Sequence, residues 1–151
     1  MKLEQLEVTN REKLEPGTVK AISRYERLIC ELGKHALPEH LTAEINALTL
    51  NLQDITEEKH LNKQVRKSTE SAINRAREKA GLVTKGYNQA LWMPVGMAAF
   101  GVPFGVAFGL LLDNLALMAV GLPLGLPIGL AVGQSMDKKA EKAGKVLFID
   151  C

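Results

Sequence analysis

The residues that most often perform chemistry in proteins are few in this chain and stand apart from one another. His35, His40 and His60 have no cysteine or carboxylate at metal-ligand spacing, so we expect them to be solvated or packed on helices. Cys30 lies among apolar neighbours on an amphipathic segment, which predicts a packed thiol and not a nucleophile. There is no phosphate loop and no GxSxG or HExxH motif. The sequence therefore predicts no enzymatic activity, no metal site and no cofactor.

The residue whose spacing repeats is glycine. A stretch of 43 residues from Leu91 to Gly133 carries a single charge, Asp113, and glycine recurs in it every four residues. The two glycine ladders are Gly101, Gly105 and Gly109, followed by Gly121, Gly125, Gly129 and Gly133. Small residues four apart form a groove on a helix, and close backbone approach matters in lipid because the hydrophobic effect does not drive helices together there. The ladders therefore predict close helix–helix contacts.

The length of this apolar stretch predicts two membrane spans. A spanning helix needs about 20 apolar residues, and the stretch is about twice that long. Asp113 and Asn114 lie at its middle, where they provide turn chemistry, and an aspartate inside one long span would be costly. We therefore predict a helical hairpin with spans at about 91–112 and 115–134. The alternative, a buried hairpin in a soluble protein, conflicts with the small apolar surface of the preceding 89 residues.

Three prolines interrupt the backbone hydrogen bonding of the predicted spans. Pro103 has no N–H for the Ala99 carbonyl, Pro123 none for Ala119, and Pro127 none for Pro123. Freed carbonyls at membrane depth are tolerated where a neighbouring helix or water satisfies them. The prolines thus predict kinked helices that are buried in an assembly or line a wet cavity. The alternative is that they merely bend two lipid-exposed helices.

The charges around the stretch predict its orientation. Positions 1–58 hold seven basic and eleven acidic residues, whereas positions 59–89 hold eight basic and two acidic ones. The lysines expected at lipid headgroups are Lys79, Lys85, Lys138 and Lys139. Because the turn at Asp113 has no Lys or Arg, the positive-inside rule places both termini in the cytoplasm. A solvated helix face is the alternative for the basic run, and its lack of interleaved aromatic residues argues against nucleic acid as a partner.

The first part of the chain predicts amphipathic helices. One should run from Thr18, as N-cap, to about Leu32, after a turn at Pro16-Gly17. A second should follow Pro38, with apolar residues in heptad spacing at Leu41, Ile45, Leu48, Leu52 and Ile55. This seam predicts an antiparallel helical hairpin with the first helix, and a self-association stripe is the alternative; the two are compatible.

A capping box at Asp54 and Glu57 would restart a third, basic helix near residue 55, although 38–80 could also form one helix. The end of the chain, 145–150, is short, apolar and strand-like, and should dock on these helices or on residues 3–8. Two cysteines are too few for a disulfide framework and predict free thiols, and the N-terminus has no apolar core for a signal peptide.

The predicted fold is all-α: a transmembrane hairpin preceded by a cytoplasmic amphipathic helical hairpin and a basic juxtamembrane helix. Its parts are an N-terminal segment (1–17), a cytoplasmic helical region (18–86), the hairpin (87–136) and a cytoplasmic tail (137–151).

Paired glycine repeats that end on the sequence GQSMDKKA, residues 133–140, resemble the glycine-zipper family of small bacterial membrane proteins. The resemblance covers about residues 91–145, and most members of that family have no assigned activity. It implies a hairpin in the bacterial inner membrane that forms homo-oligomers. The function expected is a membrane-anchored assembly or scaffold module that binds a cytoplasmic partner through residues 18–56. The alternative is a pore-forming or membrane-perturbing effector gated by the cytoplasmic helices.

Overall fold

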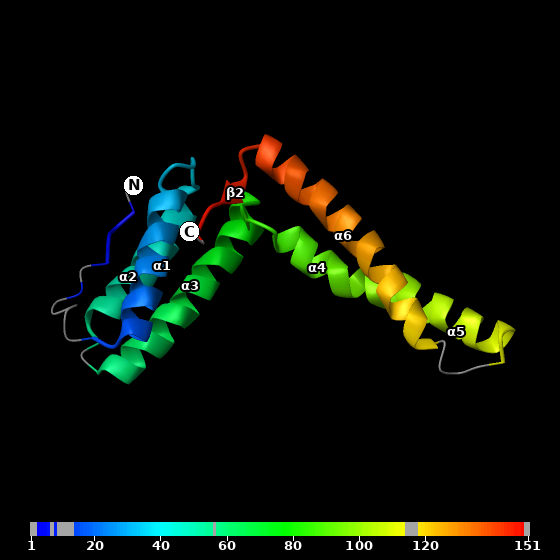
Figure 1. The fold of residues 1–151 in the computed structure, drawn as a ribbon. Coiled ribbons are helices and arrows are strands. Elements are labelled where there is room, and N and C mark those ends of the chain that lie inside the picture. Colours follow the sequence, from blue (N-terminus) through cyan, green and yellow to red (C-terminus); the bar gives the residue numbers. More distant parts are fainter. Residues whose placement is uncertain (1–2, 7, 9–13, 56, 114–117, 150–151) are drawn as a thin grey trace. The chain divides into compact units, whose positions relative to one another are not determined.

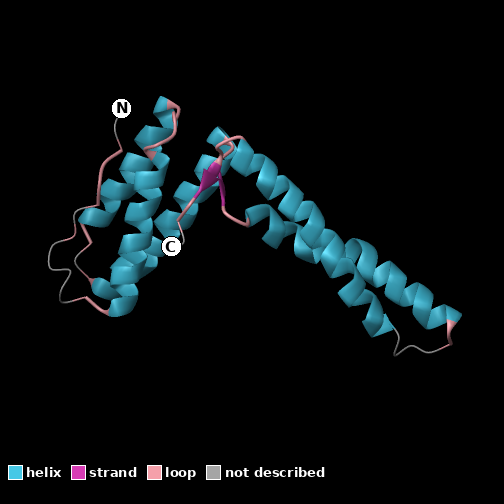
Figure 2. Cartoon of the chain, turned by 45° about the horizontal axis from the view of Figure 1, so that its top comes forward, coloured by secondary structure: helices cyan, strands magenta, loops and turns pink. Residues whose placement is uncertain are grey.

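The computed structural model consists mostly of helices, and these form two compact units (Figures 1 and 2). Unit 1 comprises Met1–Thr84 together with Leu147–Cys151, and unit 2 comprises Lys85–Val146. The structure describes every residue except 1–2, 7, 9–13, 56, 114–117 and 150–151. The predicted helical class is confirmed, and the exceptions among the described residues are two strands of two residues each.

Unit 1 contains three helices, α1 (Pro16–Leu32), α2 (Glu39–Gln53) and α3 (Glu58–Ala80). Helix α3 contacts both α1 and α2. One face of α3 is apolar and buried in the core that the three helices share. Its buried apolar side chains are Leu61, Val65, Ala72 and Ala76. The basic helix α3 therefore forms part of the core of unit 1 with one face and presents its other face to solvent.

The centre of unit 1 holds one polar chain of hydrogen bonds. Tyr25 on α1 is fully buried, and its hydroxyl lies 2.8 Å from the Thr49 hydroxyl on α2. Thr49 donates its own proton to the Ile45 carbonyl over 3.1 Å, so Tyr25 must be the donor to Thr49. Burial raises the pKa of Tyr25, which keeps this proton in place. The contact joins α1 to α2 in the interior without leaving a buried polar group unpaired.

Two predicted helix starts in unit 1 are wrong. Helix α1 begins at Pro16, whose fixed φ suits the first turn of a helix, and its N-cap is Glu15. Thr18 is buried inside the helix, where its hydroxyl accepts a hydrogen bond from the Asn62 amide over 2.9 Å. The capping box is also absent. Asp54 ends α2, and Glu57 caps α3 with no side-chain hydrogen bond.

The same boundaries show that residues 38–80 form two helices and not one. They also show where the heptad seam of α2 lies. Leu41, Ile45 and Leu52 are almost completely buried in the core of unit 1, with Leu48 and Ile55 packed against it. The seam is therefore buried within unit 1, where α2 packs mainly on α3 and contacts α1 through Thr49 and Tyr25, and it is not free for self-association.

Both ends of the chain contribute to unit 1. Strand β1 (Val83–Thr84) pairs with β2 (Val146–Leu147), and the side chains of Leu147 and Ile149 enter the hydrophobic core. Leu6 from the N-terminal segment is buried in the same core. The strand-like end of the chain therefore packs on the helical unit.

Unit 2 is an antiparallel pair of long helices. The first is continuous through α4 (Tyr87–Gly96), the π-helical turn η2 (Met97–Gly101) and α5 (Val102–Leu111), and the second is α6 (Met118–Lys142). Both are long and apolar enough to cross a membrane by length and composition. The first begins four residues before the predicted span, and α6 extends to Lys142, so the start of the predicted tail is helical.

Candidate functional site: the glycine interface of the apolar hairpin

The second glycine ladder packs on the first arm inside the hairpin and meets the first ladder at Gly121 and Gly125, and all seven ladder glycines are buried. A methyl group on Gly121 would collide with the backbone of Gly101 and Gly105. One on Gly125 would lie 2.5 Å from the Gly96 carbonyl oxygen and 2.7 Å from the Gly101 nitrogen. These distances are far inside van der Waals contact, so only glycine fits. The arms therefore meet backbone to backbone.

The remaining glycines of α6 continue this interface toward the base of the hairpin. A methyl group on Gly129 would collide with the Trp92 carbonyl, and one on Gly133 would collide with the backbone of Gln89. Together, the ladder glycines of α6 pack along the first arm from Gln89 to Gly105. One chain thus supplies both sides of a long small-residue interface.

Gly96 belongs to this interface, although the four-residue spacing does not include it. A methyl group on Gly96 would lie 2.6 Å from the Gly125 carbonyl oxygen and equally close to the Gly129 backbone. Gly96 precedes Gly101 by five residues, a step that would rotate it by about 140° in an ideal α-helix. The π-helical turn Met97–Gly101 takes up the extra residue and keeps Gly96 on the ladder face.

Pro103 stands next to this π-helical turn. Its ring cannot approach the carbonyl four residues earlier, and a widened turn relieves that clash. The Val102 N–H donates to the Met97 carbonyl, five residues back, and not to the Ala98 carbonyl. The sequence signal for this π-helical turn was a glycine five residues before the first glycine of the ladder, with a proline two residues after that ladder glycine.

The other prolines do not interrupt their helices. Helix α6 runs through Pro123 and Pro127, and α4 contains Pro94, a fourth intrahelical proline that the sequence analysis passed over. All four prolines are exposed, on the side of each helix that faces away from the glycine interface. The carbonyls they free therefore lie toward the outside of the hairpin.

An aspartate closes the base of the hairpin. The Asp137 carboxylate on α6 accepts hydrogen bonds from the backbone N–H groups of Asn88 and Gln89, both at 3.1 Å, and from the Asn88 amide at 2.9 Å. Asn88 and Gln89 are in the first turn of α4, whose N–H groups have no partner within the helix. Asp137 therefore caps α4 from the opposite arm. Nothing in the spacing around Asp137 indicates this role, because its partners lie 48 and 49 residues earlier in the chain.

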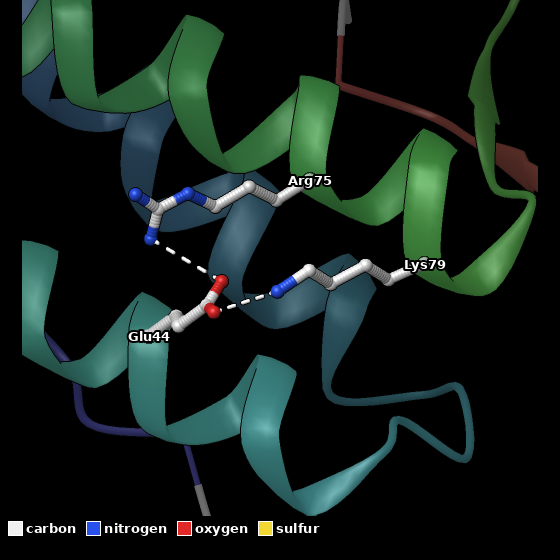
Figure 3. Close-up of polar contacts among 3 residues, drawn as sticks. All are labelled: Glu44, Arg75 and Lys79. Atoms are coloured by element: carbon white, nitrogen blue, oxygen red, sulfur yellow. Dashed lines mark hydrogen bonds and ion pairs between the residues drawn. The ribbon is translucent and has the colours of Figure 1, made fainter.

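The predicted turn and lysines are placed as follows. Asp113 adopts a left-handed backbone conformation, with φ of 47°, directly after the first arm, and Asn114 lies outside the described residues. Lys85, Lys138 and Lys139 are exposed. Lys79 is exposed as well, and its ammonium group donates to the Glu44 carboxylate over 2.6 Å (Figure 3).

Glu44 on α2 also lies 3.4 Å from the Arg75 guanidinium, so two cations of α3 converge on one carboxylate (Figure 3). The hydrogen bond from Lys79, with the charges of Lys79 and Arg75, lowers the pKa of Glu44. These two basic residues of the segment before the hairpin thus have a partner within unit 1. Lys79 is less available to a lipid headgroup than the sequence suggested.

Unit 1 has a surface cleft of about 870 Å³ between the N-terminal segment, the second half of α1 and the start of α2. Leu3, Leu6 and Leu37 supply apolar walls, and Cys30 and His35 also line it. Among the described residues no cluster of His, Cys, Asp or Glu could hold a metal ion. The predicted packing of the Cys30 thiol is wrong, because Cys30 is an exposed free cysteine near the C-terminal end of α1.

No known protein family, curated protein or solved structure matches this chain.

Proposed function

We propose that this protein is a two-span membrane protein whose hairpin anchors the helical unit 1 at the cytoplasmic face of a bacterial inner membrane, where unit 1 binds a protein partner. One observation carries the proposal. The hairpin buries glycine and exposes large apolar side chains, the reverse of a water-soluble helix pair.

The exposed side chains of the hairpin belong in lipid. Large apolar residues are exposed along both arms. Examples are Leu91, Val95, Phe100, Phe104 and Phe108 on the first arm, and Val120, Leu124, Ile128 and Val132 on the second. Only 22% and 24% of the two apolar stretches are buried, whereas the core helix of a soluble protein is mostly buried. An exposed apolar surface of this extent in water would mark an association or aggregation site, and hydrocarbon removes that cost.

Orientation and partner binding extend the proposal. The flanking Lys85, Lys138 and Lys139 support a cytoplasmic base, with the Asp113 turn on the opposite side. Within residues 18–56 the apolar seam is buried, so a partner would contact the exposed surface of α1 and α2, including the cleft. Homo-oligomers would form through outward apolar side chains of the arms away from the prolines, because the glycine faces already contact each other. A pore requires a continuous polar lining, whereas the side chains of the glycine interface and of the outer faces are apolar and the few carbonyls that the prolines free lie near one depth, so we retain the anchor.

The membrane proposal is tested by two matched lysine substitutions in the full chain. Val102 on α5 and Leu50 on α2 are each 50% exposed. A lysine at an exposed site of a soluble protein changes stability little, whereas one near the centre of a span costs about 2.5–3.5 kcal/mol in insertion. We expect V102K to reduce the fraction that resists alkaline carbonate extraction from bacterial membranes, and L50K to leave it unchanged. The proposal would be overturned if V102K and L50K resisted extraction to the same extent, or if the unsubstituted protein were found in the soluble fraction.

Orientation and assembly have separate tests. With both native cysteines replaced by serine, a single cysteine at Asp113 should react with a membrane-impermeant maleimide added to intact spheroplasts, and one at Lys142 should react only after lysis. A mass of one protomer in several mild detergents would count against homo-oligomers. Conductance of the purified protein in a planar bilayer would support the pore instead.

A further inference from the structure

We propose that the proline-bearing outer faces of the hairpin bind a transmembrane helix of another protein that carries hydroxyl or amide hydrogen-bond donors near the middle of the membrane. This inference rests on the proposed insertion of the hairpin into a bilayer. It assigns the outer faces of the arms to a partner of defined chemistry.

Several carbonyl groups of the hairpin have lost their helical hydrogen-bond donors. Pro103 has no N–H for the Ala99 carbonyl, and the Val102 N–H goes to Met97 in place of Ala98. On α6, Pro123 and Pro127 have no N–H for the carbonyls of Ala119 and Pro123. These four backbone acceptors have therefore lost the N–H that a regular α-helix would give them, as has the Ala90 carbonyl before Pro94 near the base of the hairpin.

These carbonyl acceptors belong to residues on the outer surface of the hairpin. Ala98, Ala99, Ala119 and Pro123 are all exposed, whereas the glycines on the opposite side of each helix are buried. The other arm of the hairpin cannot reach around to satisfy them. In hydrocarbon there is no water to satisfy such a carbonyl, so an external donor has a large energetic advantage there.

Three of the four carbonyl acceptors lie at about the same level along the length of the hairpin. Gly125 packs against Gly96, Met97 and Gly101, which puts Ala98 and Ala99 at the level of the segment between Gly121 and Gly125. Ala99 is the middle residue of the helical arm Tyr87–Leu111. The carbonyls of Ala98, Ala99 and Pro123 thus lie at about the same depth near the middle of the hairpin, those of the two arms on opposite outer faces, and that of Ala119 lies about one turn further toward Asp113.

A second copy of this chain cannot supply side-chain hydrogen-bond donors at this depth. No residue of 93–112 or 115–133 has a side-chain N–H or O–H group. A copy inserted at the same depth would bring apolar side chains and further proline-freed carbonyls to this level. A helix with serine, threonine, asparagine or glutamine at its centre would instead donate to them, as polar residues do between membrane helices.

The test uses the full chain in phosphatidylcholine–phosphatidylglycerol vesicles with a donor dye on a single cysteine at Lys142, both native cysteines being replaced by serine. The probe is a synthetic leucine-rich spanning helix with two serines four residues apart at its centre, carrying an acceptor dye. The matched control peptide has alanine in place of both serines. From the strength of hydrogen bonds between membrane helices, we expect energy transfer to report roughly 3-fold to 30-fold tighter binding of the serine peptide.

Two variants connect this preference to the freed carbonyls. P103A/P123A/P127A restores the missing N–H groups and should abolish the preference for serine over alanine. F104A removes exposed apolar area from the same arm without changing a backbone donor, and should keep the preference. Equal binding of the two peptides, or a preference that survives the triple substitution, would overturn the inference.

Energy transfer between copies of the chain and flotation with the vesicles are measured as well. Energy transfer between two copies of the chain that disappears in the triple variant would assign these faces to a second copy and overturn the inference. Flotation of the chain with the vesicles is measured first. Loss of flotation would overturn the membrane proposal together with this inference, whereas flotation with equal peptide binding would overturn this inference alone.

Discussion

Gly96 and Gly125 lie in backbone contact across the hairpin, so close that a methyl group on either one would be within 2.6 Å of the other's carbonyl oxygen. Gly96 reaches this position because the π-helical turn Met97–Gly101 shifts it onto the ladder face. The pair shows how the arms are joined: through main-chain atoms, at a distance that no side chain permits.

We expect G125L to force the arms apart. A leucine at this site would overlap the backbone of Gly96 and Met97, and overpacking of a close interface typically costs about 1–3 kcal/mol or more. Spin labels on cysteines at Val95 and Ile128, both exposed, should report a longer and broader distance distribution in vesicles. The control is A107L, which adds similar bulk at an exposed position of the first arm. An unchanged distribution in G125L would contradict the backbone contact.

We expect D137A to loosen the base of the hairpin. The substitution removes the acceptor for the first N–H groups of α4, and loss of a helix cap costs about 0.5–2 kcal/mol. Hydrogen exchange at the amides of Asn88 and Gln89 should speed up by roughly 2-fold to 30-fold, while the amides of α1 should not change. K138A, at the exposed neighbouring residue, should leave both regions as they are. Equal exchange in D137A and K138A would show that the cap has no energetic role.

We expect L147A to destabilise unit 1, although Leu147 lies more than sixty residues after its last helix. Leu147 is completely buried in the core of unit 1, and removal of a buried leucine side chain costs about 2–5 kcal/mol. Hydrogen exchange of α1–α3 in the full chain measures the change. F148A alters an exposed neighbour and should cost about 0.5 kcal/mol or less. Similar exchange in both variants would remove the C-terminal residues from the core.

We expect the contribution of Glu44 to depend on pH. The Lys79 hydrogen bond holds the pKa of Glu44 below its ordinary value of 4.5, so the folded state favours the carboxylate. This contribution is complete above that value and is lost as the pH falls through the lowered pKa. E44Q should therefore lower Tm slightly at pH 7, and the difference from the unsubstituted protein should disappear in acid. E70Q, at an exposed glutamate of α3, is the control. A difference that persists at low pH would point to lost packing.

The helical class, the amphipathic first helix and the buried positions of α2 followed from the sequence, because apolar periodicity reports directly which face of a helix is buried. The starts of α1 and α3 did not. Thr18 and Asp54 have the side chains of capping residues, but the hydrogen bond from Asn62 and the packing of α3 on α1 move the ends of these helices. Caps depend on which groups tertiary contacts bring near, and sequence spacing does not contain that information.

The glycine ladders show the same division. By itself the sequence determined that two apolar helices separated by Asp113 would carry small residues on one face, because glycine spacing and length are local properties. Only the tertiary structure decided that the two ladders contact each other, that Gly96 joins them through a π-helical turn, and that Asp137 caps the opposite arm. Each of these depends on the register between residues 16 to 49 positions apart, which backbone packing in three dimensions sets.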